Sequence, residues 1–222
     1  MRLIMIIGFL CFTSTLNAQE FRVPSVDSSR ANKWDFSFSI LSTESESYSS
    51  ANESGLDISS ETGWGFGIGY NLNTHFALAF DFSYSQPRYT ATLVDENDVP
   101  ASFSHKMTIN TGQFKGIWNF VDGPLTPYAE LGLGWTYLDS NVASSPPITG
   151  CWWDPFWGYI CDTFYSTYND TSFSYSGGLG VRWQITPGFF LRGSYNLLKI
   201  DMSNSAGDPE LYSWRMDIGT SF

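Results

Sequence analysis

Bulky apolar residues and small or polar residues alternate along most of this chain, with a period of two residues. In residues 62–72 the bulky set is Trp64, Phe66, Ile68, Tyr70 and Leu72, and the residues between are Gly63, Gly65, Gly67 and Gly69. Successive side chains of a β-strand point to opposite faces, whereas a helix brings together residues three or four apart. The alternation therefore predicts strands with one bulky apolar face and one small, polar face.

The alternation recurs often enough to predict eight strands. It is regular in residues 34–41, 62–72, 75–85, 128–138, 172–185, 189–197 and 211–222, and irregular between Ser104 and Phe120. In the irregular segment Met107 and Ile109 are out of phase with Phe114 and Trp118. We therefore expect either a bulge in this strand or an extension of it into a long loop.

The connections between these strands alternate in length. Residues 71–74, 121–125 and 186–188 form tight links that contain Asn, Gly or Pro, and residues 42–61, 86–103, 139–171 and 198–210 form long ones. Strands of about 9–11 residues with short turns at one end and long loops at the other are typical of membrane barrels. The prediction is an all-β, eight-stranded antiparallel up-and-down transmembrane β-barrel with short periplasmic turns and long extracellular loops.

The composition of the two strand faces indicates which one contacts lipid. A soluble barrel would place bulky apolar residues inside and charges outside, whereas an eight-stranded barrel has room inside only for its own side chains. Here the non-apolar face consists mainly of Gly, Ala and Ser with a few charges, and the chain is 18% aromatic but only 15% charged. We expect the apolar face to point outward and the small, charged face to line the lumen.

Eight charged residues fall on the predicted lumenal face, four of each sign. They are Asp35, Asp81, Lys115, Glu130, Arg182, Arg192, Arg215 and Asp217. An unpaired charge in a narrow interior is strongly destabilising, so these residues are expected to pair. Two interpretations remain. The charges form either a static network of salt bridges and hydrogen bonds, or a gate in which a change of ion-pair partners opens a thin path for water or ions.

The first residues have the features of a secretory signal peptide. Arg2 precedes an apolar run from Leu3 to Phe12, and the small residue Ala18 is suited to cleavage. The predicted organisation is therefore a signal peptide over residues 1–18, a periplasmic N-terminal segment over 19–33 and a barrel over 34–222. Past residue 20, no apolar run is long enough for a helical span.

The third long loop carries two cysteines among many aromatic residues. Cys151 and Cys161 are separated by nine residues, and in an oxidising compartment the pair predicts a disulfide. The candidate contact residues of this loop are Trp152, Trp153, Phe156, Trp157 and Tyr159. They either pack on one another or extend an interfacial girdle, or they bind a host surface, a glycan or a partner.

Net charge and histidine content limit the other function classes. A formal charge of −11 argues against binding nucleic acid. The acids of the loops form a solvated surface, or bind a divalent cation through the run from Asp95 to Asp98, but no resident metal or cofactor is expected. His75 and His105 are the only histidines, and His105 cannot readily contact its neighbour Ser104, because adjacent strand residues face opposite sides. We therefore expect no enzymatic activity.

Three segments resemble a known family: Ser176–Asn196, Pro127–Trp135 and the closing Phe222. They are similar to the small outer-membrane, porin-like barrels related to OmpA, OmpX and OmpW. The resemblance implies a location in the outer membrane of a Gram-negative bacterium, in contact with its lipid and lipopolysaccharide. It also implies an alternating C-terminal signal for the barrel-assembly machinery, matched by Trp214, Met216, Ile218 and Phe222 and interrupted by Thr220.

The sequence thus predicts a structural or surface-interaction protein whose loops bind a host or surface ligand. The alternative is a narrow channel for water, ions or small solutes that is gated by the lumenal salt bridges.

Overall fold

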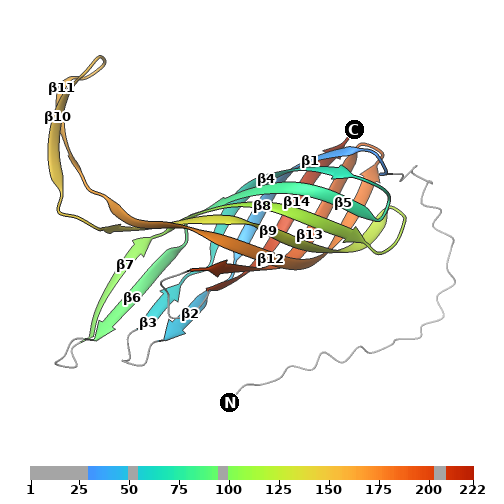
Figure 1. Ribbon diagram of the computed structural model, residues 1–222, viewed down its shortest axis with the longest axis horizontal. Coiled ribbons are helices and arrows are strands. Elements are labelled where there is room, and N and C mark those ends of the chain that lie inside the picture. Colours follow the sequence, from blue (N-terminus) through green and yellow to red (C-terminus); the bar gives the residue numbers. More distant parts are fainter. Residues whose placement is uncertain (1–29, 50–54, 95–99, 203–208) are drawn as a thin grey trace.

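A closed eight-stranded barrel forms the body of the protein (Figure 1). The computed structural model describes residues 30–49, 55–94, 100–202 and 209–222. The barrel strands are β1 (Trp34–Thr43), β4 (Glu61–Asn71), β5 (Phe76–Ser85), β8 (Thr108–Asn119), β9 (Leu125–Ala143), β12 (Thr167–Thr186), β13 (Phe189–Asp201) and β14 (Glu210–Ser221). Each pairs antiparallel with the next one along the chain, and β14 pairs with β1. The predicted fold is confirmed.

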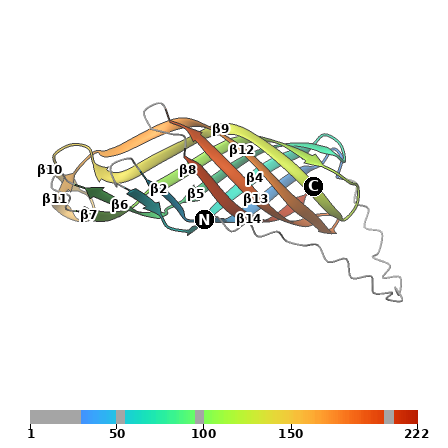
Figure 2. The ribbon, with the colours of Figure 1, turned by 90° about the horizontal axis from the view of Figure 1, so that it is seen from below.

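Six further strands lie in three of the long connections. β2 (Glu46–Ser49), β3 (Gly55–Ile58), β6 (Arg88–Val94) and β7 (Pro100–Lys106) form a four-stranded sheet, and β10 (Ile148–Asp154) pairs with β11 (Gly158–Phe164) in a hairpin. Figures 1 and 2 place the sheet and the hairpin at the same end of the barrel, which we call the loop end. The short β4–β5, β8–β9 and β12–β13 turns lie at the opposite end, the turn end. In the described residues no helix is long and apolar enough to cross a membrane.

Two barrel strands are longer than the sequence pattern predicted. β9 has 19 residues and β12 has 20, because their pairing continues beyond the barrel as far as Ala143 opposite Thr167. The predicted signal peptide and the acidic run from Asp95 to Asp98 lie outside the described residues.

The irregular segment is an extension and contains no bulge. β7 ends at Lys106 and β8 begins at Thr108, so only Met107 separates the loop-end sheet from the barrel strand. The pairing of β8 with β5 and with β9 is continuous. Ile109 is out of phase with Phe114 because it points inward, where it is 5% exposed.

The two faces of the strands point as predicted. On β1, Phe38 is 50% exposed, while its neighbours Ser37 and Ser39 are buried. The same contrast separates Leu131, which is 74% exposed, from the buried Glu130 on β9. The bulky apolar side chains therefore form the outer surface, which only a lipid environment favours.

Inward-facing glycines make room for large lumenal side chains. A Cβ on Gly219 would lie 2.2 Å from the ring of Phe190, and one on Gly180 would lie 2.6 Å from the ring of Tyr128. Both rings are almost fully buried in the lumen. Small residues on one strand are thus complementary to bulky residues on a neighbouring strand.

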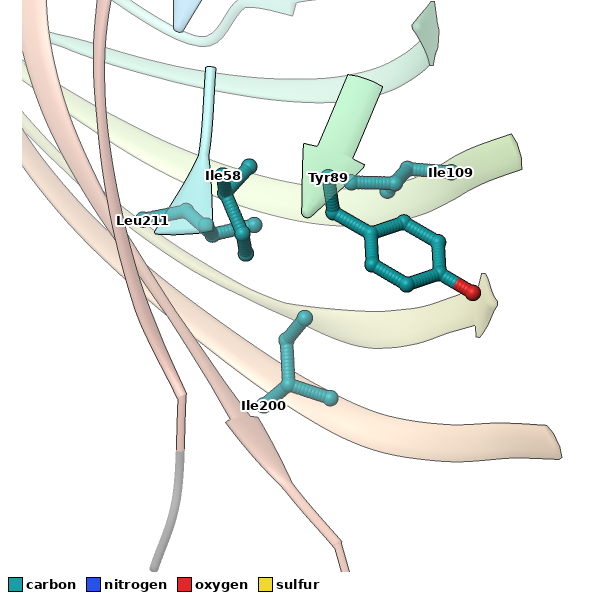
Figure 3. Close-up of a cluster of buried hydrophobic side chains, with 5 residues drawn as sticks. All are labelled: Ile58, Tyr89, Ile109, Ile200 and Leu211. Atoms are coloured by element: carbon teal, nitrogen blue, oxygen red, sulfur yellow. The ribbon is translucent and has the colours of Figure 1, made fainter. Parts of the chain in front are cut away.

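An apolar cap closes the lumen at the loop end (Figure 3). Its buried residues are Ile58, Tyr89, Ile109, Ile200 and Leu211. Ile109, Ile200 and Leu211 occupy the last lumenal positions of barrel strands, and Ile58 and Tyr89 come from the loop-end sheet. The Tyr89 hydroxyl donates to the Ser140 carbonyl at 2.9 Å, and burial raises the pKa of this phenol, so it remains protonated. The loop-end sheet is therefore anchored onto the barrel by a small hydrophobic core.

The complementarity between Gly219 and Phe190 predicts that one added methyl group lowers stability at Gly219 but not at Gly193. Gly219→Ala is expected to lower the free energy of unfolding by about 1–3 kcal/mol, because the new Cβ would lie 2.2 Å from a ring that is fully buried. Gly193→Ala is the matched control, since a Cβ there has no neighbour within 4 Å. Urea unfolding in lipid bilayers measures both variants, and equal effects would contradict the proposed packing.

Candidate functional site

The lumen contains all eight charged residues that the alternation assigned to it. They come from seven of the eight barrel strands and are between 3% and 7% exposed. β4 is the one barrel strand that contributes no charge to the lumen, since its inward positions are the neutral residues Gly63, Gly65, Gly67, Gly69 and Asn71.

Six of these charges form one continuous chain of ion pairs with alternating sign. Lys115 Nζ lies 2.8 Å from Glu130 and 3.0 Å from Asp81 Oδ2, and the same Asp81 oxygen accepts from Arg215 at 2.9 Å. Arg215 also donates to Asp217 at 2.6 Å, and Asp217 lies 3.0 Å from Arg192 Nε. Each charge in the chain therefore has at least one partner of opposite sign.

The remaining pair lies closer to the turn end. Arg182 makes an ion pair with Asp35, which also accepts a hydrogen bond from Ser221 at 2.6 Å. Phe190 links this pair to the longer chain, because its ring centroid lies 3.9 Å from the guanidinium of Arg182 and 5.3 Å from that of Arg192. Cation–π contact allows two like-charged guanidinium groups to share one buried ring.

The glycines of β4 allow the network to cross the lumen. Arg215 on β14 reaches Asp81 on β5, although β1 and β4 lie between these strands in the barrel. On the way its Nη2 donates to Ser39 at 2.7 Å, and a Cβ on Gly67 would lie 2.2 Å from Asp81 Oδ1. A side chain on β4 would therefore occupy the space that the ion pairs require.

A ninth buried charge, which the sequence pattern missed, lies at the turn end. Arg30 is 4% exposed and donates through Nη2 to the Gly123 carbonyl at 3.0 Å and to Thr126 Oγ1 at 2.7 Å. It precedes β1, so no alternation marked it as lumenal. Arg30 occupies the turn end of the barrel as the apolar cap occupies the loop end.

A small cavity lies in the interior of the barrel. A cavity of about 10 Å³, bordered by Asp35, Asp81, Tyr128 and Arg192 among others, lies within the lumen. This volume is about the least that holds one water molecule. With Arg30 at one end and the apolar cap at the other, the arrangement favours a static network over a water-filled path.

The β10–β11 hairpin is the second candidate site, and we call it the aromatic arm (Ile148–Phe164). Cys151 lies opposite Cys161 in its ladder, and the two sulfur atoms form a disulfide. The arm projects from the loop end, away from the barrel strands (Figures 1 and 2). The disulfide joins the two strands at the middle of the hairpin, which limits their separation there.

The predicted contact residues on the arm are exposed and make few contacts with one another. Trp153, Phe156, Trp157 and Tyr159 are 69–86% exposed, and Trp152 is 40% exposed and packs beside Phe164 at 5.6 Å between ring centroids. Their position beyond the barrel also separates them from the aromatic rings of the lipid-facing surface. The geometry therefore supports neither self-packing of the whole set nor a girdle.

The proposed assembly signal and the histidines lie elsewhere. Trp214, Met216, Ile218 and Phe222 all point outward, along or just after β14, the strand that closes the barrel against β1. His75 lies beside the β4–β5 turn and His105 is on β7. Within the described ranges, no group of three His, Cys, Asp or Glu side chains is placed to hold a metal ion.

Asp81 lies between two cations, which predicts that neutralising it strongly lowers the stability of the barrel. Asp81→Asn is expected to lower the free energy of unfolding by about 3 kcal/mol, because it removes the charge that Lys115 and Arg215 share in a buried site. Glu210→Gln is the control, since its pair with Lys199 is partly exposed and is worth about 1 kcal/mol or less. Urea unfolding in bilayers distinguishes the two, and a similar small change in both would refute a stabilising network.

Comparison with known proteins agrees with this architecture. The N-terminal β-barrel domain of Pseudomonas aeruginosa OprF is similar at 14% identity, with a TM-score of 0.51 over 86% of this chain and 98% of that one. The outer membrane protein OprG of the same organism is similar at 13% identity, with a TM-score of 0.51 over 89% and 99%. No curated protein sequence matches. The profile of the outer membrane protein beta-barrel domain matches residues 9–222. The chain therefore belongs to the outer membrane protein beta-barrel domain family.

Proposed function

We propose that this protein is a surface-interaction protein of the outer membrane, in which a sealed barrel supports a ligand-binding aromatic arm. The observation that carries the proposal is the exposure of four aromatic side chains on a hairpin that pairs only with itself in the described sheets. Soluble surfaces rarely expose such a patch unless it contacts a partner. The partner is a host or other surface ligand.

The barrel has a structural role in this proposal. Its outer residues contact membrane lipid and lipopolysaccharide, and its C-terminal alternation (Trp214, Met216, Ile218 and Phe222) is read by the barrel-assembly machinery. The separation of Ser104 from His105 on opposite faces of β7 supports a role without catalysis. Export by a cleaved signal peptide over residues 1–18, followed by a periplasmic segment over 19–33, completes this proposal.

The sealed lumen predicts that the protein does not conduct. Wild type and Glu130→Ala are both expected to give no stepwise current in planar bilayers, because removing one carboxylate leaves the apolar cap and Arg30 in place. Conductance in the wild type, changed by Glu130→Ala, would instead favour the gated channel for water, ions or small solutes.

Removal of the arm tests the surface role. Deletion of Ile148–Phe164 takes away both cysteines and both arm strands, and is expected to reduce attachment of expressing cells to host cells by about tenfold. A second variant replaces the same residues with a Gly/Ser linker of equal length and controls for loop length. Both variants must reach the cell surface in wild-type amounts, which surface labelling measures. Attachment equal to that of the wild type in both variants would remove the proposal.

A further inference from the structure

The tip of the aromatic arm carries apolar side chains on both faces of the hairpin and in its turn. Trp153 lies opposite Tyr159 on one face of the hairpin, and Trp152 lies opposite Ile160 on the other. Phe156 and Trp157, which are 86% and 79% exposed, occupy the turn between the strands. A protein groove normally covers one face of a hairpin, whereas a tip with apolar side chains on both faces and in its turn is suited to a medium that surrounds it.

The one carboxylate at the tip is engaged in the turn itself. Asp154 Oδ1 accepts hydrogen bonds from the backbone amides of Phe156 at 2.8 Å and Trp157 at 3.0 Å. These bonds satisfy the two amides and stabilise the turn that carries both exposed rings. Trp and Tyr rings are enriched at the headgroup level of bilayers, where an apolar body and a polar N–H or O–H are both accommodated.

The charge of the whole loop restricts the kind of membrane. Residues 139–171 contain Asp139, Asp154, Asp162 and Asp170 and no Lys, Arg or His. A loop with four acids and no base is repelled by anionic lipid, including the lipopolysaccharide-rich surface around its own barrel. A zwitterionic phospholipid surface imposes no such repulsion.

The position of the arm directs its tip away from the membrane that the barrel spans. Both views place the hairpin at the loop end, beyond the ends of the barrel strands (Figures 1 and 2). The tip is therefore separated from the exposed apolar band of residues such as Leu131 and Leu133 in the middle of the barrel.

We propose that the tip of the aromatic arm inserts into the interface of a second, zwitterionic phospholipid bilayer. This proposal rests on the surface role proposed above and names the partner. Trp153, Phe156 and Trp157 enter the headgroup region, and the disulfide between Cys151 and Cys161 keeps the strands below them together.

The test uses the full-length protein in nanodiscs, mixed with separate vesicles and analysed by flotation. Wild type is expected to float with phosphatidylcholine vesicles and less with vesicles that contain phosphatidylglycerol. Brominated chains in the phosphatidylcholine are expected to quench part of the Trp fluorescence. The triple variant Trp153→Ser, Phe156→Ser, Trp157→Ser is expected to bind about 100-fold more weakly, because three aromatic contacts with the membrane are lost.

A matched variant controls for the general loss of exposed apolar surface. Ile148→Ser, Phe164→Ser and Tyr168→Ser alter three residues that are 51–71% exposed but lie farther from the tip. This variant is expected to float as wild type does. Heat-modifiable migration in gels verifies that both triple variants retain the folded barrel.

Three outcomes would overturn membrane insertion. They are wild type that does not float with phosphatidylcholine vesicles, equal binding by the tip variant and the matched control variant, or stronger binding to the anionic vesicles. Loss of cell attachment on arm deletion without any vesicle binding would leave the surface role standing and indicate a protein or glycan partner. Vesicle binding by a protein whose arm deletion leaves cell attachment unchanged would contradict the surface role alone.

Discussion

The inability of lipid to form hydrogen bonds is the constraint on which this structure depends. Every backbone amide in the membrane must pair with a neighbouring strand, so the sheet closes with β14 against β1. Closure creates an interior that is out of contact with bulk water. The charges placed there must then neutralise one another, which the series of ion pairs from Glu130 to Arg192 achieves with alternating signs.

A closed barrel of eight strands also limits how much side chain its interior accommodates. β4 therefore presents glycines to the lumen, while Arg215 extends across it to Asp81. Phe190 and Tyr128 are accommodated in the same way opposite Gly219 and Gly180. The small residues are as necessary to the network as the charges, because a Cβ at these positions would displace the groups that neutralise one another.

Much of this architecture could be predicted from the sequence, because alternation over eight or more residues specifies both strand and facing. Seven of the eight barrel strands and the lumenal position of Arg182 follow from regular alternation, whereas the pattern of β8 is irregular because the apolar residue Ile109 points into the lumen. The loop-end sheet could not be predicted, because β2 and β3 have four residues each and contain too few alternations. Arg30 was missed because it precedes the first strand, and the cap was missed because Ile58 and Ile109 meet only after the chain folds back.

The static lumen that we propose bears on where the specificity of the protein resides. In the proposed function the lumen has a structural role, because paired charges occupy it and Arg30 and the apolar cap lie at its two ends. The outer band faces lipid, and in the proposed function it is the loop end that contacts another surface. There the aromatic arm differs from the acidic surroundings in carrying exposed rings on both faces of a disulfide-linked hairpin. The rigidity that pairing gives to the barrel thus provides a fixed base from which the arm extends.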